Sequence, residues 1–166
     1  THPKWYFVEK DYMKSYAGYR GEVAADYHLQ FLPKGKYHIL LDLRIPVGEH
    51  FMQIDTLIVS TNVIFLLEVK NFSGTLLFDE ENQQMIRVLG GKEEGFLHPG
   101  LQSQRHQFLL KDWLNQHKFP QTPIKSFIVI SNPSTIIKFL SGNPNCNILH
   151  AAQVPYKLDS ISNRFK

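Results

Sequence analysis

The chain lacks the features that mark several special classes of protein. Its single cysteine, Cys146, excludes an internal disulfide and a cysteine-rich zinc site. No nonpolar run approaches the ~18 residues that a membrane span requires, and no signal peptide is visible. These absences predict a cytoplasmic protein without membrane contact in this chain.

The chain also has only a small excess of positive over negative charge. The formal net charge is +3 among 166 residues, and the basic residues are dispersed without a block. This balance permits contact with a phosphate backbone without demanding it. The chain contains no Gly-rich nucleotide loop, no serine elbow and no HExxH pair among its eight histidines. Common nucleotide, hydrolase and zinc-protease sites are therefore not expected.

Length and composition predict one globular domain over residues 1–166. The hydrophobic content of 43% and the charged content of 20% are those of an ordinary packed protein. A chain of this length buries about 70% of its unfolded surface without needing disulfides. The 13% aromatic content is spread through the expected strands and helices, which favours core packing over base stacking.

A first helix is predicted over Gly21–Leu32. Val23, Tyr27 and Phe31 recur at every fourth position, as the buried stripe of an amphipathic helix does. Glu22 lies at the margin of this expected stripe.

The remaining elements alternate between strands and helices. Uninterrupted nonpolar runs in the strands indicate an α/β fold in which a central mixed sheet is flanked by helices. A second helix is expected to begin at Pro99 and to end before Pro120, burying Leu101, Phe108, Leu109, Trp113 and Leu114. The other predicted elements are strands at Tyr37–Ile45, Ile54–Val59, Val63–Val69, Lys125–Ser131 and Asn147–His150, a hairpin of Gly74–Phe78 with Met85–Leu89, a mobile loop at Gly90–Gly95, and a helix beginning in Asp159–Lys166.

The strands Ile54–Val59 and Val63–Val69 place charges in an otherwise nonpolar hairpin. Because only Ser60-Thr61-Asn62 separates them, they are expected to pair antiparallel, with paired residue numbers summing to 123. Asp55 then faces Glu68, and Gln53 faces Lys70. All four side chains would share one face of the sheet.

Two carboxylates that face each other across a hairpin repel, so their presence calls for an explanation. Like charges on opposed residues lie roughly 5 Å apart and destabilise a sheet by about 0.2 to 1 kcal/mol. A divalent cation, with Lys70 beside Glu68, would relieve the repulsion, and Mg²⁺ typically takes one or two protein carboxylates. This composition indicates a phosphodiester-cleaving site.

Two alternatives remain open for these charges. A register slip of one residue would move Asp55 to the opposite face from Glu68. The charges could also lie on the solvated side of a half-covered sheet. Against the second alternative, Val63–Leu67 is nonpolar without alternation, which favours a strand covered on both faces.

Several short motifs together resemble one known family. They are Gly21-Glu22, Gln53-Ile54-Asp55, EVKNFSG at Glu68–Gly74, and a helix start of the form Pro99-x-x-Gln102. This set resembles the nuclease-related domain, NERD, of the PD-(D/E)XK nuclease superfamily. Two departures are Thr56, where the family often has a bulkier or histidine residue, and His98, where it often has asparagine.

The resemblance implies both a fold and a site. The fold would be the restriction-endonuclease-like core, ordered αβββαβ, over about residues 19–131, with 132–166 as a C-terminal extension. Asp55 and Glu68 would hold Mg²⁺ (or Mn²⁺), with the backbone carbonyl of Val69 as a further ligand. Lys70 would orient the attacking water or stabilise charge developing on the phosphate.

Glu22, Gln102 and His106 would lie around this expected site. Glu22 would approach from the helix and hold Lys70 or a water, although an isolated helical glutamate is as often only solvated. Gln102 would hydrogen-bond a phosphate, a water or Lys70, a role that rests on the resemblance. His106 lies one helical turn beyond Gln102 and is the one histidine expected near the site.

The leading hypothesis is a Mg²⁺-dependent nuclease whose partner is nucleic acid, specifically DNA. A competing hypothesis is a nucleic-acid-binding or interaction module that keeps the nuclease fold without turnover, because fold does not fix function. A third is a metal-dependent enzyme acting on another phosphate ester.

Overall fold

The computed structural model describes residues 4–140 and 147–165, so Cys146 lies outside the described part. Two sheets form the molecule, one with strand order β1-β2-β3-β7-β9 and one with order β6-β5-β4-β8. The helices are α1 (Trp5–Leu29), α2 (Pro99–Gln116), the short 3₁₀ helix η1 (Ala151–Gln153) and α3 (Val154–Ser162). The strands are β1 (His38–Val47), β2 (His50–Val59), β3 (Ile64–Lys70), β4 (Thr75–Asp79), β5 (Gln84–Leu89), β6 (Lys92–Leu97), β7 (Ile124–Ile130), β8 (Ile136–Phe139) and β9 (Ile148–His150). None of these described helices combines the length and nonpolar character needed to cross a membrane.

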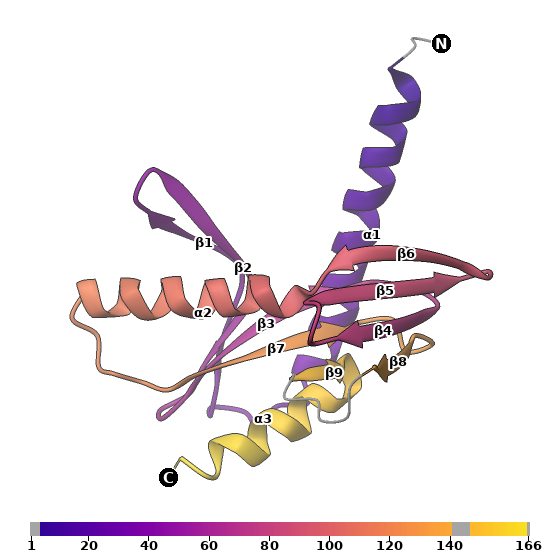
Figure 1. The fold of residues 1–166 in the computed structure, drawn as a ribbon. Coiled ribbons are helices and arrows are strands. Elements are labelled where there is room, and N and C mark those ends of the chain that lie inside the picture. Colours follow the sequence, from indigo (N-terminus) through magenta and orange to yellow (C-terminus); the bar gives the residue numbers. More distant parts are fainter. Residues whose placement is uncertain (1–3, 141–146, 166) are drawn as a thin grey trace.

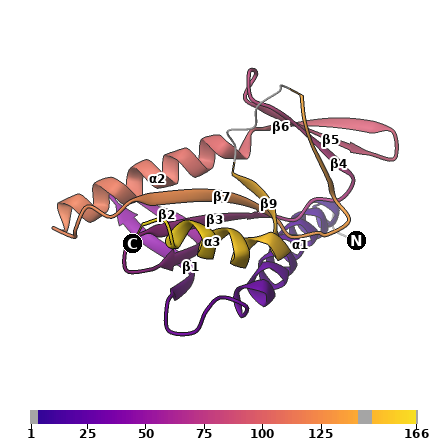
Figure 2. The ribbon, with the colours of Figure 1, turned by 90° about the horizontal axis from the view of Figure 1, so that it is seen from below.

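The five-stranded sheet is covered by helices on both faces. Figures 1 and 2 show α2 on one side and α3 on the other. Phe65 and Leu67 of β3 pack in one core with side chains of α1 and α3, whereas Ile64 and Leu66 pack in a second core with Leu110 of α2. The prediction that this strand is buried on both sides is confirmed.

The central sheet is mixed, as predicted. Strands β1, β2 and β3 are successively antiparallel, and β7 runs parallel to both β3 and β9. The expected order of helix, three strands, helix and strand is confirmed by α1, β1 to β3, α2 and β7. The inserted strands β4 to β6 form the second sheet with β8, so segments after residue 131 add one strand to each sheet.

The predicted register of the β2–β3 hairpin is confirmed where the two strands pair. Thr56–Val59 pairs with Ile64–Leu67, and each pair of residue numbers sums to 123. The ladder ends at the Thr56–Leu67 pair, however, so the predicted pairs of Asp55 with Glu68 and of Gln53 with Lys70 do not form. Beyond that point β2 stays paired with β1, where Gln53 faces Arg44. Together they form the hairpin that projects from the body in Figure 1.

The buried side of α1 was predicted wrongly. Val23, Tyr27 and Phe31 are all exposed, by 49%, 61% and 59%. The residues of α1 that the sheet buries lie on the other side of the helix: Gly21, Ala25 and Leu29. The smallness of the first two lets the helix approach the sheet closely, which leaves the larger aromatic row outside. The helix also begins 16 residues earlier than predicted, at Trp5.

Four further differences concern the middle and end of the chain. Residues Lys92–Leu97 form strand β6 rather than a loop, because Gly90 and Gly91 adopt positive φ angles of 58° and 76° and turn the chain back onto β5. In α2, Phe108 is 71% exposed, and Leu110 is buried instead.

The C-terminal helix also lies elsewhere than predicted. It begins at Val154, ahead of Asp159, and ends at Ser162. Strand β8, Ile136–Phe139, was not predicted because it is a short strand with alternating exposed and half-buried residues.

A close contact fixes α1 against the sheet next to Glu22. A Cβ atom on Gly21 would lie 2.6 Å from Asn71 Cβ and 2.9 Å from Ser131 Oγ. Asn71 Nδ2 also donates to the carbonyl of Ala17 at 2.7 Å. Only glycine permits this approach without displacing its neighbours, so the position of Glu22 depends on Gly21.

Replacing Gly21 with alanine tests this contact. Gly21→Ala is expected to lower the free energy of unfolding by about 1–3 kcal/mol, the usual range for an overpacked site. The matched control is Gly18→Ala in the same helix, where an added Cβ meets nothing within 4 Å. The control should raise stability by about 0.5–1 kcal/mol through helix propensity. Urea unfolding followed by circular dichroism measures both, and equal effects would contradict the close contact.

Candidate active site

Asp55 lies at the point where the β2–β3 ladder ends. Its Oδ2 atom accepts a hydrogen bond from the backbone N–H of Val69 at 2.8 Å, so the carboxylate takes the donor that a further strand pair would use. The side chain is half-buried. Asp55 is thereby held beside the end of β3.

Glu68 and Lys70 project from the end of β3 toward α2. Glu68 is 5% exposed, and its Oε1 accepts from Lys70 Nζ at 2.7 Å. The same ammonium donates to Gln102 Oε1 on α2 at 3.2 Å. Three predicted site residues from two distant parts of the sequence are therefore in direct contact.

The first turn of α2 is fixed by His98. The ring Nδ1 accepts from the backbone N–H of Gly100 at 3.0 Å, and Pro99 occupies the first helical position. The histidine that replaces the family's usual asparagine thus still caps the helix. This cap sets the direction from which Gln102 meets Lys70.

His106 follows one turn later on the same face of α2. Its Nδ1 lies 3.6 Å from Glu68 Oε2. Burial is the largest influence on this imidazole and lowers its pKa, an effect that nearby Arg105 and Lys70 reinforce and Asp55 opposes. The neutral ring is therefore favoured more than in a free histidine.

Both carboxyl groups of the site have raised pKa values. Burial raises the pKa of Asp55, and this outweighs the lowering by the Val69 N–H, Lys70 and His106. Burial also raises the pKa of Glu68, with a further rise caused by Asp55; the Lys70 ion pair lowers it without offsetting the burial. The two groups therefore carry negative charge at an energetic cost that a bound cation would reduce.

Glu22 joins this group of acids from α1. Its pKa is raised first by burial and then by repulsion from Asp55, Asp42 and Asp26. Glu22 thus lies near other acids, and the predicted contact with Lys70 stays a prediction.

Asp42 is a site residue that the sequence prediction missed. It lies on β1 between the pairs Leu41–Thr56 and Leu43–Ile54, which places it across from Asp55. Its φ angle is +46°, a left-handed conformation that is uncommon for a non-glycine residue, and its Oδ1 accepts from Gln53 Nε2 at 2.8 Å. Counting residues back from the Gly48 turn would have aligned it with Asp55.

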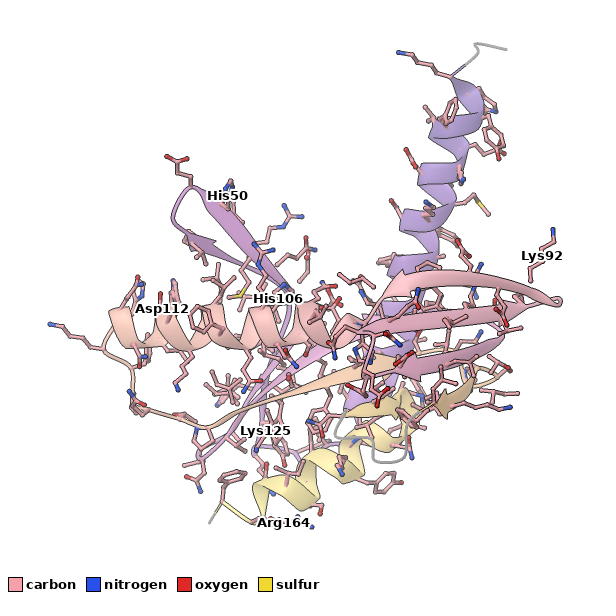
Figure 3. All side chains as sticks on the ribbon, viewed as in Figure 1. His50, Lys92, His106, Asp112, Lys125 and Arg164 are labelled. Carbon is pink, nitrogen blue, oxygen red and sulfur yellow. The ribbon has the colours of Figure 1, made fainter. Side chains whose placement is uncertain are left out.

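Three of these residues line an open cleft of about 500 Å³ between β2 and α2. Asp55 lines it from the strand, and Gln102 and His106 line it from the helix. In Figure 3, His106 lies where α2 passes the β1–β2 hairpin. A substrate can therefore reach Asp55 from solvent.

The donor set limits which metal could bind. Within the described ranges, no group of three or more His, Cys, Asp and Glu side chains is placed to hold an ion. Zinc sites usually need three or four such ligands. Mg²⁺ needs one or two carboxylates and otherwise keeps water or phosphate oxygens, which fits Asp55 and Glu68. The predicted carbonyl ligand of Val69 stays a prediction.

The raised pKa of Asp55 predicts that its charge destabilises the metal-free fold. A carboxyl whose folded-state pKa exceeds its unfolded value costs stability at high pH, and that cost disappears as pH falls through the folded-state pKa. Asp55→Asn removes the charge but keeps an oxygen for the Val69 N–H. In chelator at neutral pH it should melt above the wild type, by about 2–4 °C per kcal/mol gained. The difference should vanish below the ordinary carboxyl pKa.

Thermal unfolding over a range of pH values measures this difference. Glu93→Gln on β6 is the control, because Glu93 is an exposed carboxylate away from the cleft. An Asp55→Asn protein that melts below the wild type at neutral pH would refute the prediction.

Comparison with known proteins agrees with this arrangement. The family described as "Nuclease-related domain" (NERD) matches residues 17–131, a span that includes all five predicted side chains of the site. No curated protein and no solved structure matches the chain. The family match covers well over half of the sequence, and the chain therefore belongs to the nuclease-related domain family.

Proposed function

We propose that this domain hydrolyses phosphodiester bonds of DNA with a divalent cation, Mg²⁺ or Mn²⁺. One observation carries the proposal: Asp55, which lines the open cleft, and the buried Glu68, which lies behind the cleft residue His106, both have raised pKa values, and the Lys70 ammonium contacts Glu68. Perturbed ionisable groups that gather in a cleft are typical of functional sites. The restriction-endonuclease-like order of elements supports the same function.

Asp55 and Glu68 are the residues that would hold the cation. When bound, it would polarise the scissile phosphate and make a water molecule a better nucleophile at neutral pH. Asp55 has one oxygen engaged by the Val69 N–H and a second available. Glu68 Oε2 lies on the side of His106, which lines the cleft. Each acid is thus oriented by internal contacts, and Asp55 itself lines the cleft.

Lys70 would stabilise the negative charge that develops on the phosphate oxygens. Its ammonium is held by Glu68 at 2.7 Å and Gln102 at 3.2 Å, and the side chain is 26% exposed. A cation whose position is fixed before the reaction needs little reorganisation when charge develops. Gln102 is therefore a positioning residue for Lys70 in this proposal.

Glu22 and Asp42 would act on the approach of water and substrate. Asp42 raises the pKa of both Glu22 and Asp55, and Asp55 raises the pKa of Glu22 further. Their charge attracts a cation and repels phosphate from their own side of the site. We therefore expect the substrate strand to approach from the α2 side, where His106 and Arg105 lie.

A second candidate is a nucleic-acid-binding module without turnover. The observation favouring it is that both carboxylates already have internal partners, Val69 N–H for Asp55 and Lys70 for Glu68. Such pairs could serve the fold alone. The raised pKa values argue against this candidate, because these partners do not offset the cost of burial.

A cytoplasmic location belongs to the same proposal. Its support is the near absence of cysteine, which suits a reducing compartment.

Cleavage assays test the enzyme directly. With Mg²⁺ or Mn²⁺, the wild type should cut supercoiled plasmid or single-stranded DNA, and chelator should stop it. Asp55→Asn and Lys70→Ala should each reduce cleavage by about 100-fold or more, as loss of one electrostatic contact to a transition state does. Lys92→Ala is the control, because Lys92 lies at the far tip of the β5–β6 hairpin (Figure 3).

The outcomes separate the three hypotheses. Equal cleavage by the wild type, Asp55→Asn and Lys70→Ala would reject these roles. DNA binding by all three proteins without cleavage would support the module. Activity on nucleotides but not on polymers would identify a different phosphate ester as substrate.

Cation binding can be measured without any substrate. Because an ion held only by the folded protein adds stability, saturating Mg²⁺ should raise the melting temperature of the wild type; at 100 times Kd the gain is about 2.7 kcal/mol. Asp55→Asn should show a much smaller rise. Differential scanning calorimetry in matched ionic strength would measure it, and equal rises would mean that Asp55 is not a ligand.

A further inference from the structure

The cleft beside Asp55 continues along the β1–β2 hairpin. On β2, Phe51, Gln53 and Asp55 are exposed or half-buried and alternate with the buried Met52 and Ile54. A strand rises about 3.3 Å per residue, so the row from Asp55 to Phe51 is roughly 13 Å long. All three members of that row line the cleft.

The opposite wall is one face of α2. Gln102, Arg105, His106 and Leu109 line the cleft and follow the spacing that puts residues on one side of a helix. At 1.5 Å per residue this wall is about 10 Å long, which matches the row on β2. The cleft is therefore a short groove with its inner end at the proposed catalytic group.

The outer part of the groove combines cations with an aromatic ring. Phe51 is 72% exposed, so the fold does not need it for core packing. Arg105 is exposed and has no acidic partner among the described residues, unlike Lys70 and Arg87, which are paired with Glu68 and Glu94. Among residues 4–140 and 147–165, Asp55 is the one carboxylate that lines this groove.

Such a combination is suited to an unpaired nucleic acid strand. Proteins hold single strands by pairing cations with phosphates and by stacking bases on aromatic rings. A groove of about 500 Å³ has the size of an ordinary small-ligand pocket, which suits one or two nucleotides better than the width of a duplex. A base can reach Phe51 only after it has left its partner strand.

We infer that this groove is a binding subsite for single-stranded nucleic acid, in which Phe51 stacks on a base and Arg105 pairs with a phosphate next to the bond to be cut. The inference rests on the proposed function for its inner end at Asp55. Binding in the groove can nevertheless be measured without cleavage.

Equilibrium binding tests the subsite. The probe is a fluorescein-labelled 12-nucleotide DNA of mixed sequence, used single-stranded and as a blunt duplex, with anisotropy read in EDTA and in Ca²⁺. The wild type should bind the single strand more tightly than the duplex. Phe51→Ala should weaken single-strand binding by about 5- to 150-fold, the effect of losing one base–aromatic stack. Phe51→Tyr should restore it.

Matched controls exist on α2. Phe108→Ala removes a ring that is equally exposed, at 71%, but does not line the groove. For the phosphate contact, Arg105→Gln should reduce the slope of log affinity against log salt by about 0.7. Lys111→Gln removes an exposed cation of the same helix that lies outside the groove and should leave that slope nearly unchanged.

The results distinguish this subsite from the proposed enzyme. Equal losses in Phe51→Ala and Phe108→Ala, preference for duplex, or no binding of the single strand would each overturn the subsite, even if Mg²⁺-dependent cleavage is found. The expected binding pattern without any cleavage would support the subsite while the proposed enzyme failed. Thermal melts of every variant confirm that each protein is folded.

Discussion

The double cover of β3 determines where the site lies. Its first residues pack against α1 and α3 on one face and against α2 on the other, so this part of the strand can carry only nonpolar side chains. The cover is complete through Glu68 and becomes partial only at Val69 and Lys70. Glu68 is therefore held in place by the buried part of β3, and the Lys70 ammonium that contacts it is partly exposed. Gly21 on one side and the His98 cap on the other then fix how closely the two helices approach.

The site and the stability of the fold make opposing demands. Packing favours neutral side chains at Asp55 and Glu68, since burial raises the pKa of both. Chemistry on a phosphate favours charged ones. Each acid has an internal donor, the Val69 N–H for Asp55 and the Lys70 ammonium for Glu68. These donors orient the carboxylates but do not fully offset the cost of burying their charge. A site with residual negative charge of this kind is better prepared for a cation than a fully paired one.

Much of this arrangement could be predicted from particular residues. The short polar segment Ser60-Thr61-Asn62 fixed the register of the hairpin, and the unbroken run before Glu68 indicated a strand buried on both faces. Contacts between elements distant in sequence were harder to predict. That Gln102 touches Lys70 depends on how α2 packs, a contact that only the family resemblance suggested.

The failures have identifiable physical causes. The spacing of Val23, Tyr27 and Phe31 is that of a buried stripe, but helix approach was decided by the small residues Gly21 and Ala25. Asp42 was missed because a register was predicted only for the β2–β3 hairpin and not for the pairing of β1 with β2. A sequence pattern shows where nonpolar residues recur along the chain. It does not show whether the sheet will pack against the row of large residues or the row of small ones.

The length of α1 has a consequence for the local stability of the chain. Residues 4–20 are exposed throughout, whereas the segment from Gly21 to Leu29 is anchored by burial against the sheet. Most of a helix's stability in a protein comes from packing of one face rather than from intrinsic propensity, and this exposed stretch has no such packing. Amide protons should therefore exchange quickly at the Trp5 end and progressively more slowly toward Gly21. The helix is one continuous element, but its hydrogen bonds should open more often in the exposed part than in the part that bears Glu22.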